Sequence, residues 1–260
     1  MTTHLIEVRN LTKIYGSGSK SVVALQNVNF GVRKDEFFTI IGPSGCGKST
    51  LLNLIAGLDK PSLGEILIDG KKVEGPNPEL MAVVFQEYAL YNWRTVLSNV
   101  EFGLEIRGVG KAERREKALK YIRLVGLSGF EDKYPSQLSG GMKQRAALAR
   151  ALSLETKVLL MDEPFGALDE QTRLLLGIEL TRIWEETKKT IVFVTHSLSE
   201  AAYLSDRILV MSARPGMVKK IVEVNIPRPR DPNSDEVNRV KAMVWDEIKD
   251  ESKRMMEVAL

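Results

Sequence analysis

One stretch of the chain has the residues and the spacing of a phosphate-binding loop. Residues 42–50 read Gly-Pro-Ser-Gly-Cys-Gly-Lys-Ser-Thr and match the pattern G-x-x-x-x-G-K-[ST]. Glycines allow backbone angles that a Cβ forbids, so such a loop can turn several N–H groups toward one anion, and the positive end of a following helix adds to the attraction. Lys48 would then reach the β- and γ-phosphates of a nucleotide, and the Ser49 hydroxyl would ligate Mg²⁺. Cys46 is interpreted as a small spacer within the loop.

Two acidic residues end an apolar run elsewhere in the chain. Asp162 and Glu163 directly follow Val158–Met161. Asp162 is placed to hold Mg²⁺, directly or through water, and Glu163 is placed to polarise a water for in-line attack on a phosphate. If these two acids were considered alone, the better interpretation would be solvated side chains at the end of a strand. The phosphate-binding loop in the same chain favours the catalytic one.

A second helix start has the composition of an anion-binding site. Ser139 is a predicted N-cap, and Gly140 and Gly141 follow it at the start of an Ala- and Leu-rich helix that extends to about Leu152. A plain capped helix is the alternative. One full phosphate-binding loop and one further cradle in the same chain suggest a composite site, in which the cradle of one subunit closes over the nucleotide held by another.

The segments that must position these residues alternate between strand and helix patterns. The loop at 42–50 lies between a β-prone run, Phe37–Ile41, and a helix-like run, Leu51–Ala56, which is the order that supports the motif. Further apolar strands alternate with helical segments, and this alternation predicts a largely parallel α/β sheet. These strands are expected at 157–161, 190–195 and 207–211, and the helices at 139–152, 174–184 and 198–204.

The remaining segments predict three further parts. An antiparallel layer is expected from the β-prone residues 5–11, 22–32 and 65–73, the last of which contains an Asp69-Gly70 hairpin turn. The pattern is helical from Val96 to Leu127. After Pro227–Pro232 ends the sheet, Ser234 caps a last helix, whose apolar stripe consists of Val237, Val240, Val244 and Ile248.

Composition and charge limit the class of protein. The chain has 260 residues, of which 43% are apolar and 27% charged, enough for one large domain or two modest ones. Its 37 basic and 34 acidic residues give a net charge of +3, which is too balanced to indicate a nucleic-acid partner. The single cysteine excludes an intrachain disulfide and suits a reducing compartment. We find no secretory signal pattern and no apolar run of the roughly 18 residues that a membrane span needs.

Taken together, Lys48, Asp162 and the string Leu138-Ser-Gly-Gly-Met142 resemble the ATP-binding cassette (ABC) ATPase family, and the resemblance covers about residues 5–226. It implies a P-loop ATPase core with a mainly parallel sheet, an antiparallel β subdomain and a helical signature subdomain. It also implies ATP and Mg²⁺ as cofactors and hydrolysis of the ATP. In this family two copies form a head-to-tail homodimer, so the Ser139 cradle of one copy would act in trans on the ATP of the other.

The resemblance also implies domain boundaries. The ABC ATPase domain is expected at residues 1–232, with its helical subdomain at about 87–156. Residues 233–260 are expected to form a C-terminal helical extension.

Four further residues match functional positions of the family. Tyr15 matches the aromatic that stacks on adenine, although it could instead be a half-buried core residue. Gln86 matches the glutamine that contacts Mg²⁺ and the attacking water, with an exposed amide at a strand end as the alternative. His196 matches the switch histidine at the γ-phosphate, and Asp169 matches the D-loop at the dimer interface.

The resemblance thus implies complete residue sets. The catalytic residues would be Lys48, Gln86, Glu163 and His196, and the metal ligands Ser49, Gln86 and Asp162. The in-trans signature would be Ser139, Gly140 and Gly141. The ATP-binding residues would be Tyr15, Gly42, Pro43, Ser44, Gly45, Cys46, Gly47, Lys48, Ser49 and Thr50.

The segment after Gln86 bears on what the ATP is used for. Residues 87–100 are rich in aromatics and lie where cassettes of this family receive the coupling helix of a membrane permease. The candidate docking residues are Tyr88, Tyr91 and Trp93, unless they pack within the helical subdomain. The string from Trp93 to Val100 and the string Ser212-Ala-Arg-Pro-Gly216 resemble the importer branch for nitrate, aliphatic sulfonates and taurine.

The expected function is therefore that of the ATPase subunit of a small-anion importer. It would be held at the cytoplasmic face of the cell membrane by separate permease subunits and would serve a solute-binding protein indirectly. The alternatives are the cassette of an exporter or of a transporter for another substrate, and a soluble ABC ATPase that transports nothing. The last class typically has two cassettes or a long coiled-coil insertion, and neither occurs in this sequence.

Overall fold

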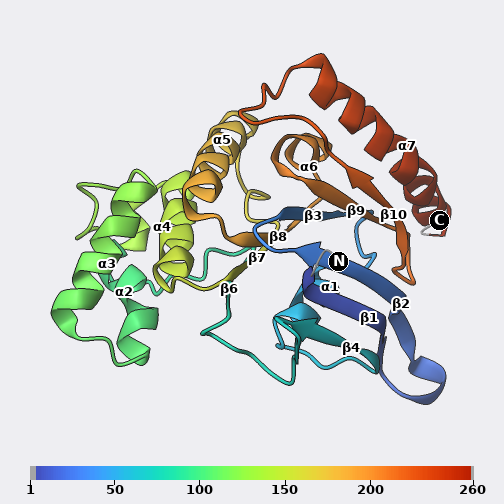
Figure 1. The fold of residues 1–260 in the computed structure, drawn as a ribbon, viewed down its shortest axis with the longest axis horizontal. Helices are drawn as coiled ribbons and strands as arrows, with labels where there is room; N and C mark the ends of the chain where they lie inside the picture. Colours follow the sequence, from blue (N-terminus) through green and yellow to red (C-terminus); the bar gives the residue numbers. More distant parts are fainter. Residues whose placement is uncertain (1–3, 259–260) are drawn as a thin grey trace. The chain divides into compact units, whose positions relative to one another are not determined.

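The computed structural model describes residues 4–258, which form two compact units. Unit 1 contains the residues up to Asn77 and those from Thr190 onward, and unit 2 contains Pro78–Lys189 (Figure 1). Among the described helices, none combines the length and the apolar character needed to cross a bilayer.

The first sheet of unit 1 is antiparallel, as the sequence predicts. It consists of β1 (His4–Tyr15), β2 (Val22–Arg33), β4 (Leu63–Ile68) and β5 (Lys71–Lys72), in the order β2-β1-β4-β5. A short 3₁₀ turn, Gly18–Lys20, lies between β1 and β2. Asp69 and Gly70 both have positive φ, of 53° and 72°, which is the backbone of a tight two-residue hairpin turn. The predicted Asp-Gly hairpin is therefore confirmed.

The second set of strands in unit 1 is mainly parallel. The central strand β3 (Phe37–Ile41) pairs in parallel with β8 (Thr190–Thr195) on one side and with β9 (Arg207–Met211) on the other. The strand β10 (Val218–Glu223) pairs antiparallel with β9. Every residue of β3, β8 and β9 is buried, which is typical of parallel strands covered on both faces. The predicted α/β fold is confirmed.

Three helices complete unit 1. The helix α1 (Lys48–Ile55) follows β3, and α6 (Leu198–Leu204) follows β8. The last helix, α7 (Asp235–Val258), begins where the Ser234 hydroxyl accepts a hydrogen bond from the backbone N–H of Val237. This helix lies beside α6 and β10 (Figure 1). Its predicted apolar stripe is buried in one cluster with residues of α6, β9 and β10 and with Ile41. The members of this stripe are Val237, Val240, Val244 and Ile248.

Unit 2 contains two parallel strands and four α-helices. The strands are β6 (Met81–Val84) and β7 (Val158–Asp162), and they pair along their length. The helices are α2 (Val96–Ile106), α3 (Lys111–Leu124), α4 (Gly140–Ser153) and α5 (Glu170–Thr187), with a 3₁₀ turn at Pro135–Gln137 before α4.

Two helix boundaries in unit 2 differ from the sequence-based expectation. The stretch from Val96 to Leu127 is two helices, because the chain turns at residues 107–110, where Gly108 has a φ of +74°. The helix expected at 174–184 begins one turn earlier, because the Asp169 carboxylate accepts a hydrogen bond from the backbone N–H of Thr172 at 2.9 Å.

Candidate functional site

In unit 1, the glycine-rich loop connects the end of β3 to the start of α1. Gly45 and Gly47 have φ values of +74° and +100°, so the turn uses backbone conformations that side chains disfavour. Lys48 is the first residue of α1 and only 6% exposed. Its ammonium group donates to the carbonyl oxygens of Gly42, at 3.0 Å, and Pro43, at 3.1 Å. The loop therefore holds its one lysine against its own backbone at a helix N-terminus.

Close packing leaves no room for a side chain at two glycines of this loop. A Cβ on Gly42 would lie 2.9 Å from the Cys46 sulfur, and a Cβ on Gly47 would lie 2.8 Å from Leu25. Cys46 is fully buried, which agrees with its interpretation as a spacer. A narrow backbone cradle with a buried ammonium group at a helix N-terminus fits the phosphates of a nucleotide, and the exposed Ser49 fits the Mg²⁺ bound to them.

His196 leaves the parallel strands at the same edge as the loop. The register pairs Ile41 of β3 with Thr195 of β8, so Gly42 and His196 both follow the carboxyl ends of neighbouring strands. This is the edge at which α/β sheets bind ligands. His196 is exposed, and Ser197 directly after it caps α6.

Tyr15 lies at the end of β1 with 43% of its surface exposed. Its hydroxyl donates to Asp59 Oδ2 at 2.9 Å, and Lys13 Nζ binds Asp59 Oδ1 at 2.6 Å. The same ammonium lies 4.7 Å from the centre of the Tyr15 ring. Burial raises the pKa of Tyr15, and a hydrogen bond with Thr50 of α1 partly offsets this. The Asp59 carboxylate thus orients a ring next to the helix that follows the phosphate-binding loop, a role that the sequence analysis missed.

In unit 2, Gln86 and the two acidic residues lie at the carboxyl ends of a pair of strands. The register pairs Val84 of β6 with Met161 of β7, so Gln86 follows one strand end and Asp162 completes the other. A Cβ on Gly166 would lie 3.7 Å from Gln86 Nε2 and 3.8 Å from Glu163 Cβ. The amide of Gln86 and the Cβ of Glu163 therefore both lie beside Gly166.

The backbone of Glu163 is strained. Its φ is +41°, a value that residues other than glycine rarely adopt. Its carbonyl oxygen accepts a hydrogen bond from Gly166 N at 3.0 Å. Such strain costs about 1–3 kcal/mol and is concentrated at functional sites. The turn from Glu163 to Gly166 therefore fixes the direction in which the Glu163 side chain points at the end of β7.

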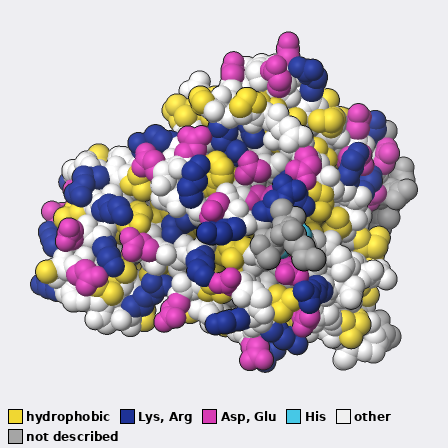
Figure 2. All heavy atoms as spheres, viewed as in Figure 1, with side chains coloured by type: hydrophobic (Ala, Val, Ile, Leu, Met, Phe, Trp, Pro, Cys, Tyr) yellow, Lys and Arg dark blue, Asp and Glu magenta, His cyan; other side chains and the backbone are white. Residues whose placement is uncertain are grey.

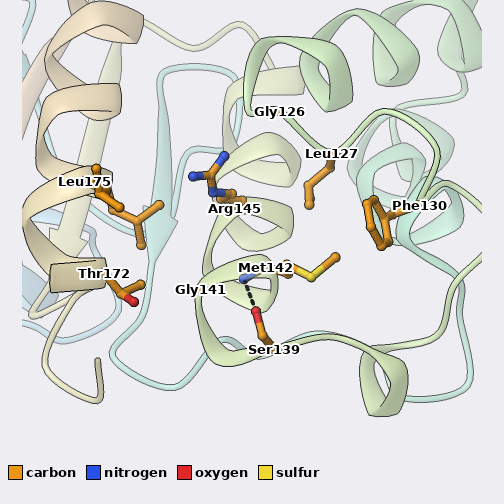
Figure 3. A pocket seen from close by; sticks show the side chains of 10 residues that line it. Gly126, Leu127, Phe130, Ser139, Gly141, Met142, Arg145, Thr172 and Leu175 are labelled. Atoms are coloured by element: carbon orange, nitrogen blue, oxygen red, sulfur yellow. Dashed lines mark hydrogen bonds between the residues drawn. The ribbon is translucent and has the colours of Figure 1, made fainter. Parts of the chain in front are cut away.

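The predicted N-cap at Ser139 is present. Its hydroxyl accepts from the backbone N–H of Met142 at 3.3 Å (Figure 3). The two glycines that follow are in close contacts: a Cβ on Gly140 would lie 3.1 Å from the Tyr88 hydroxyl, and one on Gly141 would lie 3.0 Å from Thr172. The start of α4 is therefore packed between the segment after β6 and the start of α5.

A pocket of about 300 Å³ opens beside this helix start. It lies between α4, α5 and the segment after α3, with Arg145 at its centre and apolar side chains from both sides (Figure 3). Its lining residues are Gly126, Leu127, Phe130, Ser139, Gly141, Met142, Arg145, Thr172, Leu175 and Leu176. Arg145 is paired with Glu179 at 3.0 Å. Asp169, which caps α5, has its pKa lowered by the hydrogen bond from Thr172.

The three candidate docking aromatics have different surroundings. Trp93 is 75% exposed, whereas Tyr88 and Tyr91 are half-buried. Tyr91 packs against Phe102, with ring centres 4.5 Å apart, and the Trp93 ring lies 5.5 Å from Tyr91. Trp93 is therefore the one of the three that presents its ring to solvent.

A buried asparagine, which the sequence analysis also missed, holds the loop that carries Trp93. Asn99 of α2 is fully buried. Its oxygen accepts from Tyr91 N at 2.8 Å, and its amide nitrogen donates to the carbonyl oxygens of Tyr91, Arg94 and Thr95 at 2.9–3.1 Å. The available signal was a polar residue on the apolar face of a predicted helix.

Charges of both signs are interspersed across the face seen in Figure 2. Opposite charges lie within a few side chains of one another there, so their fields largely offset each other.

A glycine loop between a parallel strand and a helix, with its lysine buried at the helix start, defines a P-loop nucleotide-binding protein. Comparisons identify the family. A family model described as ABC transporter matches residues 25–166. The chain is 54% identical over 246 residues to an uncharacterized ABC transporter ATP-binding protein of Methanocaldococcus jannaschii, with 95% of this chain and 92% of the relative covered. The chain belongs to the ABC transporter family.

Two further relatives carry names that state a solute. An aliphatic sulfonates import ATP-binding protein of Bacillus cereus is 44% identical, over 92% of this chain and 94% of the relative. A nitrate import ATP-binding protein of Synechocystis is also 44% identical, over 91% of this chain and 88% of the relative. Among solved structures, a dimeric ATP-binding cassette in a post-hydrolysis state with ADP and phosphate matches with a TM-score of 0.75 and 36% identity, over 85% of this chain and all of that one. The chain is an ATPase of this family, with ATP and Mg²⁺ as its cofactors.

Proposed function

We propose that this chain is the ATP-hydrolysing subunit of an importer that takes up a small anion, such as nitrate, an aliphatic sulfonate or taurine, through a separate membrane permease. The observation that carries the proposal is the buried Lys48 in its glycine cradle, in a chain 44% identical to both a nitrate and an aliphatic sulfonate import ATP-binding protein. Equal identity to the two does not favour one solute over the other.

The residues of unit 1 have the chemistry to bind the nucleotide. We propose that the residues 42–50 hold the phosphates through backbone N–H groups and that Lys48 shares its ammonium between the loop carbonyls and the phosphate oxygens. The Tyr15 ring, steadied by Asp59, would stack on the adenine. With Lys13 over the ring, the adenine would use the opposite face.

The residues of unit 2 and His196 have the chemistry to promote hydrolysis. Ser49, Gln86 and Asp162 would ligate Mg²⁺, which when bound neutralises charge on the phosphate oxygens. Glu163, held by its strained turn, would accept a proton from the attacking water, and the Gln86 amide, which also lies beside Gly166, would orient that water. The exposed His196 would donate a hydrogen bond to the γ-phosphate.

A second copy of the chain would complete the site. Ser139, Gly140 and Gly141 start a capped helix, and such a start attracts anions. We propose that this helix start of one copy closes over the ATP of the other, with Asp169 at the interface. The dimeric solved relative supports this arrangement.

Docking to the permease is assigned to the exposed aromatic surface after β6. Trp93 would insert its ring into the permease, while Tyr88 and Tyr91 support the docking surface from within. The permease would hold the chain at the cytoplasmic face of the cell membrane, and a solute-binding protein would deliver the anion. In this proposal residues 1–232 form the ATPase domain, with its helical subdomain at about 87–156, and residues 233–260 form an extension.

Uptake by cells tests the proposal. A strain that lacks this gene is complemented with the wild-type gene or with Glu163→Gln, and uptake of nitrate, an alkanesulfonate and taurine is measured in parallel. The proposal predicts that one of these anions enters only with the wild-type gene. Equal uptake of all three by the deletion strain and both complemented strains would overturn the assignment to small anions.

A further inference from the structure

The loop between β9 and β10, residues 212–217, lies directly on the phosphate-binding loop. Arg214 donates to the Gly45 carbonyl oxygen at 3.3 Å. A Cβ on Gly216 would lie 2.1 Å from the Cys46 carbonyl oxygen, so the two backbones are in contact with no room for a side chain between them. A shift of residues 212–217 would therefore move the backbone that cradles the phosphates.

The β9–β10 loop is also hydrogen-bonded to the strand β2. Gly216 N donates to Ala24 O at 2.9 Å, and Gln26 N donates to Gly216 O at 3.0 Å. The residue between these partners, Leu25, is the one that a Cβ on Gly47 would meet. The cradle is thus backed by two segments that hydrogen-bond to each other.

One buried acid of the last helix holds this loop. Glu251 of α7 is 7% exposed, and its Oε2 accepts from the backbone N–H of Ala213 at 3.0 Å. Lys219 of β10 lies 3.5 Å from the other carboxylate oxygen. Within the loop, the Ser212 hydroxyl donates to Pro215 O at 3.1 Å and accepts from Met217 N at 3.0 Å. The loop is therefore braced from within, and a charged hydrogen bond ties it to α7.

The same helix also belongs to the buried cluster that contains the residue before the phosphate-binding loop. Val244 and Ile248 of α7 share a buried cluster with Ile41, which directly precedes Gly42. The last helix is therefore linked to the phosphate-binding loop in two ways, through the buried cluster that it shares with Ile41 and through Glu251, which binds the segment that touches Gly45 and Cys46.

We propose that Glu251 is a positioning residue for the phosphate-binding loop, acting through residues 212–217, and that α7 thereby sets the affinity of the chain for ATP. The inference rests on the proposed nucleotide site and adds a determinant that lies more than 200 residues away in the sequence. It also gives the string Ser212-Ala-Arg-Pro-Gly216 a physical role. Ala213 binds Glu251 of α7, and Arg214 and Gly216 contact the phosphate-binding loop.

Titration of the full-length protein with a fluorescent ATP analogue tests this inference. Glu251→Ala removes the acceptor for Ala213 N and is expected to weaken binding roughly fivefold, which is about the net effect of losing one ordinary hydrogen bond. Glu251→Gln keeps an oxygen acceptor at the same place and should restore most of the affinity. The matched control is Glu247→Gln, one turn earlier on α7, whose carboxylate binds Lys220, and it should bind as the wild type does.

Steady-state ATPase assays separate positioning from general destabilisation. Glu251→Ala should raise KM for ATP with little change in kcat, and hydrogen exchange should quicken at residues 42–47 but not in β1 or β4. If Glu251→Ala does not fold, Ser212→Ala tests the same path by loosening the loop from within, and it should also weaken binding. Wild-type affinity in the folded Glu251→Ala protein, or in Ser212→Ala, would overturn the inference. Failure of the wild-type protein to bind the analogue at all would instead overturn the proposed function.

Discussion

At the scale of single residues, the proposed nucleotide site depends on where one ammonium group is held. Lys48 is buried, and its ammonium group is hydrogen-bonded to two loop carbonyls. Its charge is therefore held at one position in the loop. In the proposed site, replacing Lys48 removes a charge-assisted contact with the phosphates, which is among the stronger interactions that a protein can offer an anion.

Lys48→Ala is therefore expected to weaken ATP binding about tenfold or more, measured by equilibrium titration. The matched control is Lys34→Ala, an exposed lysine just before β3, which should leave the affinity unchanged. Unchanged affinity in Lys48→Ala would remove its phosphate role.

Asp59 gives a prediction that depends on pH. Burial acts to raise the pKa of its carboxyl, but hydrogen bonds from Lys13 and Tyr15 outweigh this and hold the pKa below 3.8. An acid whose pKa is lower in the folded state stabilises the fold above its ordinary pKa, and this contribution is lost as the pH falls through the folded-state value. At neutral pH the contribution is fully present.

Asp59→Ala is therefore expected to lower the free energy of unfolding by the same amount from pH 8 to pH 5, with the difference from wild type shrinking below pH 3.8. Because Asp59 also orients the Tyr15 ring, KM for ATP should rise a few-fold. A stability difference that grows toward low pH would contradict the stated cause.

At the scale of elements, local sequence predicted those features whose partners are close in the chain. The cap at Ser139, the Asp69-Gly70 hairpin and the loop before Lys48 each depend on residues within a few positions, so their spacing could be recognised. Asn99 and Asp59 could not be found in this way. Asn99 bonds to a loop up to eight positions before it, and Asp59 is 44 and 46 positions from its partners.

Asn99 shows what such a residue contributes to an element. Replacing it by leucine would leave the backbone groups of Tyr91 and Arg94 without their partner, so Asn99→Leu should destabilise the protein by about 2–4 kcal/mol in urea unfolding. The exposed Asn92 in the same loop offers a control, since Asn92→Leu should change stability by less than about 0.5 kcal/mol. Equal stabilities of the two variants would show that the bonds of Asn99 do not hold the loop.

At the scale of the whole molecule, the proposed site residues are divided between the two units. Unit 1 carries the phosphate-binding loop, Tyr15 and His196, and unit 2 carries Gln86, the acids after β7 and the Ser139 helix start. The motifs indicated these roles because each is a short string of fixed spacing. The hydrogen bond that links α7 to the loop beside residues 42–50 could not be predicted. Its partners, Glu251 and Ala213, are 38 positions apart, and no local pattern relates them.

The order of motifs in the sequence places both halves of an ATP site in one chain, yet the Ser139 cradle is assigned to the nucleotide of a second copy. Closure of two copies over two ATP molecules is the step that would drive the permease. A variant that binds ATP but does not hydrolyse it should accumulate in the closed state.

The central claim is tested most directly by the molar mass of Glu163→Gln in solution, measured by light scattering with and without saturating ATP and Mg²⁺. We expect a monomer without nucleotide and a stable dimer with ATP, and we expect that adding Ser139→Phe to the same protein abolishes the dimer while ATP still binds. A Glu163→Gln protein that binds ATP and remains monomeric, or a dimer that persists unchanged with Ser139→Phe, would contradict it.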